Sequence, residues 1–489
     1  MVPKWGIDPF ARIFLTQERP AKNLLATMST TPYDLIVIGG GPAGYVGAIR
    51  ASQLGKRVAV VEKERAGGTC LNWGCIPTKA LLKNAELYST IGHHAADFGL
   101  EVSGLKYDWD KVIGRSRKVA DKLAGGIEFL LKKNKVDYIK GDASVPKAGV
   151  VEVKGTDGKE QTLTTAKVLI ATGVVTREMP GFAFNGSSVI GSRHALVMPK
   201  QPKELIVIGA GAIGIEFAYF FNAFGTKVTV VEMMPNILPV EDTEVSVALE
   251  KSLIKQDIRI LTGTKVEKAE TTKDGVKITV SGGANETLAA DVALVAIGVS
   301  PLLPGGAAPI KLDDRGYIAV SDRYETSIPG VYAAGDIIGP PWLAHVASWE
   351  AVQAVEGMFG RRTPARKRAF PGCTYCHPQV ASVGLTERAA KEKGLKLKIG
   401  KFPFQASGKA MAVGDTDGFV KLLFNEPHGE LVGAHIIGAD ATEMIAEMGL
   451  AITLEATYDD IASTIHAHPT LSEAMFEATE AALGHAIHI

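Results

Sequence analysis

The apolar positions of the chain form two similar units. Residues 33–38 and 205–208 are short runs of mostly β-branched apolar residues, typical of strands that are buried on both faces of a parallel sheet. A glycine-rich stretch follows each run, and a second apolar run then follows at residues 58–61 and 228–231. The pattern predicts two strand–helix–strand units, each of which starts a parallel sheet covered by helices.

The glycines of the first unit match a dinucleotide-binding fingerprint. Gly39 permits a tight turn, Gly41 lets the backbone approach a pyrophosphate, and Gly44 lets the helix pack closely on the sheet. The start of that helix favours an anion because its N–H groups are unpaired. Glu62 ends the second run, where a carboxylate can accept hydrogen bonds from ribose hydroxyls. The unit therefore predicts a site for an adenine dinucleotide.

The second unit repeats the same residue types at matching offsets. Gly209, Gly211 and Gly214 follow its first run, and Glu232 ends its second run. A carboxylate at that position repels a 2′-phosphate, and the two methionines that follow supply no cation to receive one, so NAD is favoured over NADP. Two such sites in one chain imply two adenine-containing cofactors.

Two cysteines follow the first fingerprint closely. Cys70 and Cys75 stand five positions apart in a segment that also contains Gly67, Gly68 and Pro77. Spacing alone leaves a static disulfide or two buried thiols open. Beside a dinucleotide fingerprint, however, the pair indicates a redox-active disulfide that exchanges electrons with the bound cofactors.

Composition agrees with a large enzyme of several domains. The chain has 489 residues, 46% of them hydrophobic and 22% charged, and its 53 basic residues balance its 53 acidic ones. This balance gives no reason to expect nucleic acid as a partner, and no apolar run is long enough to predict a membrane-spanning helix. Four cysteines do not make a secreted disulfide scaffold, so a cytoplasmic location is expected.

Five separated segments resemble the flavin-dependent pyridine nucleotide–disulfide oxidoreductase family. They are the cysteine segment, the two fingerprints, residues 331–336 and residues 466–473. Within the family, the chain is most similar to the members that oxidise protein-bound dihydrolipoamide to lipoamide with NAD+. The resemblance implies a homodimer whose lipoyl-bearing partner is the E2 acyltransferase of a 2-oxoacid dehydrogenase complex or the H protein of glycine cleavage.

The resemblance also implies the fold. We expect an α/β chain with two Rossmann-like dinucleotide-binding domains, for FAD and NAD, and a C-terminal α+β dimerisation domain. The expected divisions are a disordered or upstream extension at 1–32, the FAD domain at 33–176, the NAD domain at 177–302, a central domain completing the FAD site at 303–370, and the interface domain at 371–489. Smaller elements are predicted from the sequence pattern: a helical insertion at 110–134, a hairpin at 150–164, strands at 380–383 and 420–424, and helices that start near Ala441 and Leu471.

Carried over residue by residue, the resemblance assigns catalytic roles. Cys75 would lie nearer the flavin and Cys70 would exchange with the dithiol substrate. Lys79 would lie near the flavin and pair with Glu216 of the second unit.

His468 would act as the base, oriented by Glu473 and contributed by the partner subunit. The physical need is that a thiolate, not a thiol, attacks a disulfide, and an imidazole can hold the proton near neutral pH.

The same resemblance assigns the cofactor sites and implies no metal. The residues expected to bind FAD are Gly39, Gly41, Gly44, Glu62, Gly68, Thr69, Lys79, Ala143, Thr172, Gly173, Asp336, Ala344 and His345. The residues expected to bind NAD are Gly209, Gly211, Gly214, Glu232, Val266 and Gly298.

The chain departs from the family pattern in two places. Residues 298–302 read Gly-Val-Ser-Pro-Leu where the family has Gly-Arg-x-Pro-Asn, so an arginine and an asparagine are absent. The second departure is the pair Cys373 and Cys376. Positions three apart in an extended strand point to opposite faces, and His377 alone does not complete a zinc site, so we interpret the pair as two buried thiols.

The sequence fits three related reductase types less well. Mercuric reductases carry a C-terminal cysteine pair that is absent after Cys376, glutathione reductases carry cations where Glu232 stands, and soluble transhydrogenases lack the cysteine pair. A purely structural subunit is disfavoured by the intact Cys70, Cys75 and His468.

Overall fold

The computed structural model describes residues 32–306, 309–365 and 369–489. The extension expected at 1–32 therefore lies outside the described residues, apart from Pro32. The fold described below is that of Tyr33–Ile489.

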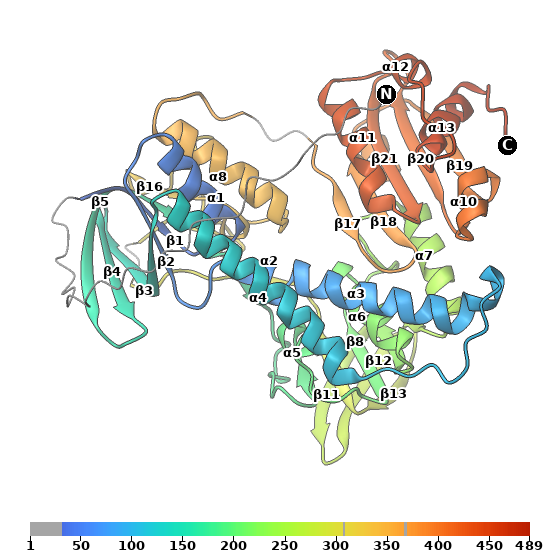
Figure 1. The fold of residues 1–489 in the computed structure, drawn as a ribbon, viewed down its shortest axis with the longest axis horizontal. Helices are drawn as coiled ribbons and strands as arrows, with labels where there is room; N and C mark the ends of the chain where they lie inside the picture. The colour runs from blue at the N-terminus through green and yellow to red at the C-terminus, as the bar shows by residue number, and fades with distance from the viewer. Residues whose placement is uncertain (1–31, 307–308, 366–368) are drawn as a thin grey trace, which may run out of the picture. The chain divides into compact units, whose positions relative to one another are not determined.

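The first unit forms a six-stranded sheet whose order is β1-β2-β3-β4-β5-β16, with β1 also paired to β5 (Figure 1). All pairs are parallel except those of β4, which runs antiparallel to β3 and β5. Buried apolar side chains on both faces explain the continuous hydrophobic runs in the sequence. The strands are β1 Tyr33–Ile38, β2 Val58–Glu62, β3 Asp137–Lys147, β4 Val150–Gly155, β5 Glu160–Ile170 and β16 Val331–Ala333.

Helices of the first unit place the cysteine segment. Helix α1 (Pro42–Gln53) has a proline in its first turn and a buried face of small residues, which lets it pack closely against α8 (Ala344–Met358). The long α4 (Trp109–Lys133) begins at Asp108, whose side chain accepts a hydrogen bond from the backbone of Lys111. The other helices are α2 Gly68–Trp73, α3 Cys75–Ser89, η1 Thr90–His94 and η2 Ala95–Phe98.

The segment after the second unit returns to the first sheet. Strand β16 pairs in parallel with β5, with Val331 opposite Val168, and Glu356 of α8 receives hydrogen bonds from Arg50 of α1 at 2.6 and 2.9 Å. The central segment therefore packs as part of the first unit. The short helix η3 (Asp336–Ile338) follows β16 directly.

The second unit is a five-stranded parallel sheet of order β10-β9-β8-β14-β7, with an antiparallel sheet β11-β12-β13 beside it. Its register repeats that of the first unit, because Leu35 pairs with Val58 just as Leu205 pairs with Val228. The strands are β7 Val189–Ile190, β8 Glu204–Ile208, β9 Lys227–Val231, β10 Arg259–Leu261, β11 Thr264–Thr272, β12 Gly275–Gly282, β13 Glu286–Ala290 and β14 Val292–Val295. The helices are α5 Ser192–Ala195, α6 Ala212–Ala223 and α7 Thr243–Lys255.

Two short strands join the units. Strand β6 (Val174–Thr176) leaves the first unit and pairs antiparallel with β15 (Val299–Pro301), which leaves the second.

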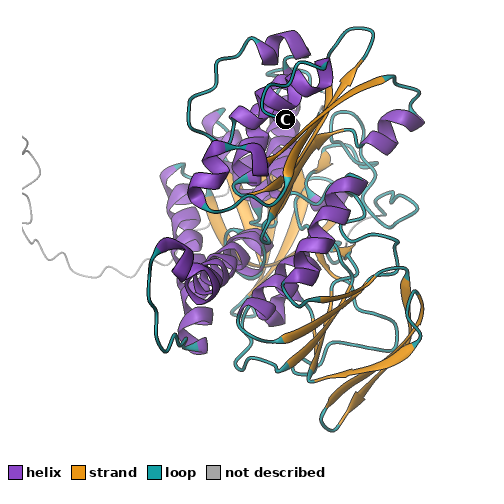
Figure 2. Cartoon of the chain, turned by 90° about the vertical axis from the view of Figure 1, so that its right-hand side faces the viewer, coloured by secondary structure: helices purple, strands orange, loops and turns teal. Residues whose placement is uncertain are grey.

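The C-terminal region is an antiparallel sheet of order β17-β18-β21-β20-β19, and Figure 2 shows helices lying against the strands. The structure confirms the strands expected near 380–383 and 420–424 and the helices expected near Ala441 and Leu471. The strands are β17 Gly372–Thr374, β18 Gln379–Gly384, β19 Leu397–Pro403, β20 Phe419–Asn425 and β21 Leu431–Gly438. The helices are α9 Glu387–Glu392, η4 Phe404–Ala406, α10 Gly408–Val413, α11 Ala441–Thr453, α12 Tyr458–Ala462 and α13 Glu473–Leu483.

The expected α/β architecture, with two parallel-sheet units and an α+β C-terminal region, is confirmed. The helical insertion expected at 110–134 is α4, and the hairpin expected at 150–164 is β4 and the first part of β5. Among the described residues, no helix is both long enough and apolar enough to cross a membrane.

Candidate functional site

The two glycine loops have matching geometry. Gly39 has φ +101° and Gly209 has φ +100°, a backbone region that side chains with a Cβ rarely adopt. A Cβ on Gly44 would lie 1.8 Å from the carbonyl oxygen of Gly39, and one on Gly214 would lie 2.0 Å from that of Gly209. Only glycine allows α1 and α6 to begin this close to the strands, so both helix starts present free N–H groups to an anion.

The two acids at the ends of the second strands also match. Glu62 Oε2 accepts a hydrogen bond from the backbone N–H of Gly40 at 2.6 Å, and Glu232 Oε2 accepts one from Ala210 at 2.7 Å. In each case Oε1 accepts a second bond, at 2.7 Å, from the N–H two residues further on. These hydrogen bonds fix each carboxylate beside its glycine loop, where its remaining lone pairs can accept hydrogen bonds from ribose hydroxyls.

The first loop has the polar surroundings that FAD requires. The buried hydroxyl of Thr172, at the end of β5, has no hydrogen-bond partner within the described part of the chain. Gly68 faces Gly41 so closely that a Cβ there would lie 2.6 Å from the Gly41 Cα, which keeps the approach to the loop free of side chains. Burial and the neighbouring Glu350 raise the pKa of Asp336 to about 6. The unpaired Thr172 hydroxyl, the open approach at Gly68 and the buried Asp336 carboxyl fit a dinucleotide, which supplies hydrogen-bond donors and acceptors.

Most of the remaining residues of the FAD prediction lie at the ends of neighbouring elements. Gly173 follows β5, Thr69 is in α2, and Ala344 and His345 start α8. Burial lowers the pKa of His345, whose Nε2 lies 3.0 Å from the Pro371 carbonyl oxygen.

Ala143 lies within β3, on a hollow of about 360 Å³ lined by β3, β4 and β5. In the second unit, Gly298 lies between β14 and β15, and Val266 lies in β11, whose first residue, Thr264, donates its N–H to the backbone oxygen of Glu232 at 2.8 Å.

The two cysteines of the first unit lie on consecutive helices. Cys70 is in α2, Gly74 separates the helices, and Cys75 starts α3. Both are free thiols. A hydrogen bond from Cys70 lowers the pKa of Cys75 to about 7, aided by Lys79 and opposed by burial. The same hydrogen bond, together with burial, raises the pKa of Cys70. In the reduced pair, Cys75 is therefore the thiol with the lower pKa.

Three parts of the chain meet at Lys79. Its Nζ lies 2.8 and 3.0 Å from the two carboxylate oxygens of Glu216, a buried residue of α6. It also lies 4.4 Å from the ring centroid of Tyr375, which follows β17. The backbone N–H of Tyr375 donates to Glu216 Oε1 at 2.9 Å. Sequence reasoning named Lys79 and Glu216 but missed Tyr375, because no local motif signals a contact between such distant segments.

The expected base and its partner are in contact. His468 Nδ1 lies 2.8 Å from Glu473 Oε1, and the N–H of Thr470 donates to Glu473 Oε2 at 2.8 Å. Burial would raise the pKa of Glu473, but these two hydrogen bonds, together with electrostatic attraction to His468 and His466, outweigh it and lower the pKa. The side chain of His468 is 80% exposed, whereas His466 is 7% exposed and bonded to Glu447 at 2.7 Å. His468 is thus the histidine of this segment that can reach another molecule.

The expectation for Cys373 and Cys376 needs a correction. Cys376 is buried and directs its thiol to the Pro378 carbonyl oxygen at 3.2 Å, but Cys373 is only partly buried. Strand β17 ends at Thr374, so the two-face argument does not apply to Cys376. Burial raises the pKa of both thiols, that of Cys373 to about 11. No group of three or more potential metal ligands occurs within the described ranges.

An arginine from another part of the chain contacts residues 298–302, the segment that departs from the family pattern. Arg177, just after β6, donates its side chain to the Val299 carbonyl oxygen at 2.9 Å and its backbone N–H to Gly298 at 3.0 Å. The antiparallel pairing of β6 with β15 brings it there, a relationship that sequence spacing does not reveal.

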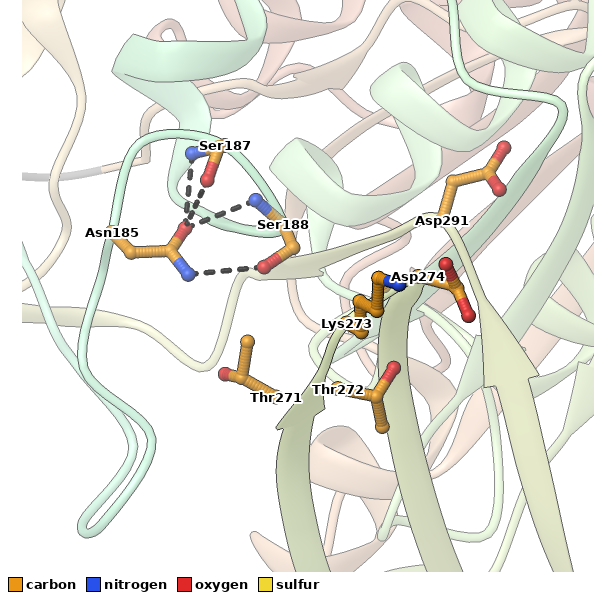
Figure 3. A pocket seen from close by; sticks show the side chains of 9 residues that line it. Asn185, Ser187, Ser188, Thr271, Thr272, Lys273, Asp274 and Asp291 are labelled. Atoms are coloured by element: carbon orange, nitrogen blue, oxygen red, sulfur yellow. Dashed lines mark hydrogen bonds between the residues drawn. The ribbon is translucent and has the colours of Figure 1, made fainter.

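A separate hollow of about 430 Å³ lies between a loop before β7 and the β11–β12 hairpin (Figure 3). The residues that line it are mostly polar. The side-chain oxygen of Asn185 accepts hydrogen bonds from Ser187 and Ser188. None of the predicted cofactor or catalytic residues lines it, so we do not assign it to the site.

Family models match almost the whole described chain. The pyridine nucleotide-disulphide oxidoreductase model matches residues 33–351, and the dimerisation domain of the same family matches residues 370–479. The chain therefore belongs to the pyridine nucleotide-disulphide oxidoreductase family.

Curated relatives share much of this sequence. A dihydrolipoyl dehydrogenase of Zymomonas mobilis is 47% identical over 93% of this chain and 99% of its own length. One of Bacillus subtilis is 44% identical over 94% and 99%, and a mitochondrial one of Arabidopsis thaliana is 40% identical over 95% and 93%.

Solved structures agree with the fold. The crystal structure of LpdA from Mycobacterium tuberculosis has a TM-score of 0.85 at 26% identity and covers 91% of this chain and 99% of its own. The flavoprotein disulfide reductase RclA from Escherichia coli has a TM-score of 0.81 at 26% identity, over 92% and 99%.

Proposed function

We propose that this chain is a dihydrolipoyl dehydrogenase that oxidises protein-bound dihydrolipoamide with NAD+. The observation that carries the proposal is the Cys70–Cys75 pair, in which one thiol has a pKa lowered to about 7, placed on helices that follow the first glycine loop. Relatives of that activity at 40–47% identity over more than nine-tenths of the chain support it.

The first glycine loop, Glu62, Thr172 and Asp336 would hold FAD, and the second loop with Glu232 would hold NAD. FAD supplies the conversion between the electron pair of a dithiol and a hydride. Glu232 favours NAD over NADP because its buried carboxylate, fixed by two backbone N–H groups, repels a 2′-phosphate.

The thiol chemistry belongs to the residues of this chain. His468 takes a proton from one thiol of dihydrolipoamide, and the resulting thiolate attacks the Cys70 sulfur of the oxidised pair. A substrate–Cys70 disulfide forms, the Cys70–Cys75 bond breaks, and Cys75 leaves as a thiolate that Lys79 stabilises. The second substrate thiol then attacks the substrate sulfur of the mixed disulfide, which closes lipoamide. Cys70 is the leaving group and takes up the proton that this thiol gives up, while His468 keeps the first proton.

The base acts across a homodimer in this proposal. His468 is oriented by Glu473 and is 80% exposed in the single chain, so it can extend toward a second copy. The dimerisation-domain match supports the dimer. The physiological partner would be a lipoyl-bearing protein, either an E2 acyltransferase or the glycine cleavage H protein.

Anaerobic stopped-flow absorbance tests the proposal. The purified protein is mixed with dihydrolipoamide and then with NAD+, and spectra are followed from the visible region to 340 nm, where NADH is measured. A yellow protein that develops long-wavelength absorbance and then yields NADH is the expected result. A flavin spectrum that ignores dihydrolipoamide but responds to NADPH or to another disulfide would move the function to a sibling reductase.

A further inference from the structure

Tyr375 belongs to the C-terminal region but touches the charged pair of the two dinucleotide units. Its ring lies 4.4 Å from Lys79 Nζ, and its backbone N–H donates to Glu216 Oε1 at 2.9 Å. One residue therefore contacts both members of the ion pair, the lysine through the aromatic face and the glutamate through the main chain.

The ring restricts a side chain that is otherwise mobile. Lysine has four rotatable methylene torsions and a compact charge that one carboxylate does not hold in a single geometry. Lys79 is 31% exposed, so burial alone does not immobilise it, whereas Glu216 is 5% exposed. A cation over an aromatic face gains an attraction that depends on its position above the ring. The carboxylate and the ring together confine the ammonium to the space between them.

The position of this ammonium matters to the cysteine pair. Lys79 lowers the pKa of Cys75, while Glu216 raises it, so the net effect depends on how the two charges are placed relative to the sulfur. An ammonium that turns away would leave the Glu216 carboxylate to act on the thiolate with less compensation.

We propose that Tyr375 is a positioning residue, whose aromatic ring holds Lys79 between Glu216 and the Cys70–Cys75 pair. The inference deepens the proposed function, because it concerns the thiolate that the disulfide exchange releases. It does not depend on which dithiol is the substrate.

Several charged or titratable groups share this environment. Burial, and after it Cys373, raises the pKa of the Tyr375 hydroxyl, so the hydroxyl and the ring have separate neighbours and can be tested separately. The groups that act electrostatically on the sulfurs of the pair are Cys70 and Cys75 themselves, Lys79, Glu216 and Asp336.

The test measures the thiol directly. In a Cys70→Ser background, the rate of Cys75 alkylation by iodoacetamide is followed against pH by peptide mass spectrometry, which separates Cys75 from Cys373 and Cys376. Relative to Tyr375 in the same background, Tyr375→Leu is expected to raise the apparent pKa of Cys75 by about half a unit to one unit. Tyr375→Phe keeps the ring and is expected to restore the parent profile. Tyr375→Met, whose side chain is similar in volume to leucine but more flexible, gives the same comparison if the leucine variant fails to fold.

The outcomes are distinct. Tyr458→Leu, which removes the contact of Lys398 with a ring 5.4 Å away elsewhere in the C-terminal region, should leave the profile unchanged. An unshifted profile in folded Tyr375→Leu or Tyr375→Met would overturn the proposal. A shift in Tyr375→Phe as large as that in Tyr375→Leu would overturn it too, because the hydroxyl rather than the ring would then be responsible. Since the assay uses neither lipoamide nor NAD+, failure of the proposed function would not produce either result.

Discussion

Glu62 and Glu232 make the same pair of hydrogen bonds in two different sheets. Each accepts an N–H from the second residue of its glycine loop, at 2.6 and 2.7 Å, and another from two residues further along, at 2.7 Å. The two proposed dinucleotide sites are therefore built on one geometry. What distinguishes them lies outside that geometry: the first loop is followed by the cysteine helices, and the second by the β11–β12 hairpin.

Replacing Glu232 with Ala should weaken NAD binding and reduce the preference over NADP. The substitution removes a charged acceptor for ribose hydroxyls, worth about 1.5–3 kcal/mol, or roughly 10- to 100-fold in dissociation constant. It also removes the repulsion of a 2′-phosphate. Dissociation constants of NADH and NADPH would be compared by fluorescence titration. Glu270→Ala, in the exposed β11 strand, serves as the control, and an unchanged NADH-to-NADPH ratio in Glu232→Ala would contradict the assignment.

Replacing Cys75 with Ser should abolish dithiol turnover and long-wavelength absorbance while the protein remains yellow. The reason is that Cys75 is the sulfur with the lowered pKa, and a serine hydroxyl cannot take its place as a leaving group or thiolate. Cys373→Ser is the matched control, since burial raises the pKa of that thiol to about 11. Normal turnover in Cys75→Ser would refute the role.

Replacing His468 with Gln should reduce the rate of dithiol oxidation by about 10²- to 10⁴-fold, the usual contribution of a positioned base. Reduction of the protein by NADH involves no substrate thiol and should change much less. Rapid-mixing experiments with each reductant separate the two effects. The equivalent change at His428, on the turn between β20 and β21, should affect neither rate. Equal losses with both reductants would indicate a structural role for His468 instead.

Glu241 gives a prediction for stability against pH. Burial raises its pKa to about 7, and its Oε2 has no hydrogen-bond partner in the described portion of the structure. The folded state thus holds a proton that the unfolded state has released, so the stability should fall as pH rises from about 4.5 to about 7. Glu241→Gln removes this titration and should become the more stable form at pH 8, by up to about 3 kcal/mol. Thermal unfolding at pH 5 and pH 8 measures the difference, and equal shifts at both pH values would contradict it.

Replacing Lys421 with an uncharged residue should cause one of the larger losses in the free energy of unfolding. Its buried ammonium lies 3.0, 2.7 and 2.6 Å from carboxylate oxygens of Asp242, Glu244 and Glu387. Lys421→Met would leave these carboxylates without their shared cation, at a cost of about 3–5 kcal/mol. Chemical denaturation would show the loss, with Lys398→Met on the neighbouring strand β19 as the control. A loss no larger than that of the control would show that the cluster contributes little.

The sequence predicts features that depend on neighbouring residues, but it does not predict contacts between segments that lie far apart in the chain. The glycine loops and the acids at strand ends could be placed because each depends on a few consecutive residues. The pairing of β16 with β5 could not be derived from periodicity, since Val331–Ala333 is too short to carry a pattern. The contacts of Tyr375 with Lys79 and of Arg177 with Val299 join segments that only the folded chain brings together. The partial burial of Cys373 likewise depends on neighbours that spacing does not identify.

The return of β16 to the first sheet has a consequence for synthesis. Asp336 and the start of α8 belong to the proposed FAD site but are translated only after the whole second unit. A ribosome that has completed residues 33–176 has therefore not yet produced these parts of the proposed FAD site. We expect a chain truncated after the second unit to fold its second glycine loop but to lose affinity for FAD, so that flavin binding reports that translation has passed β16.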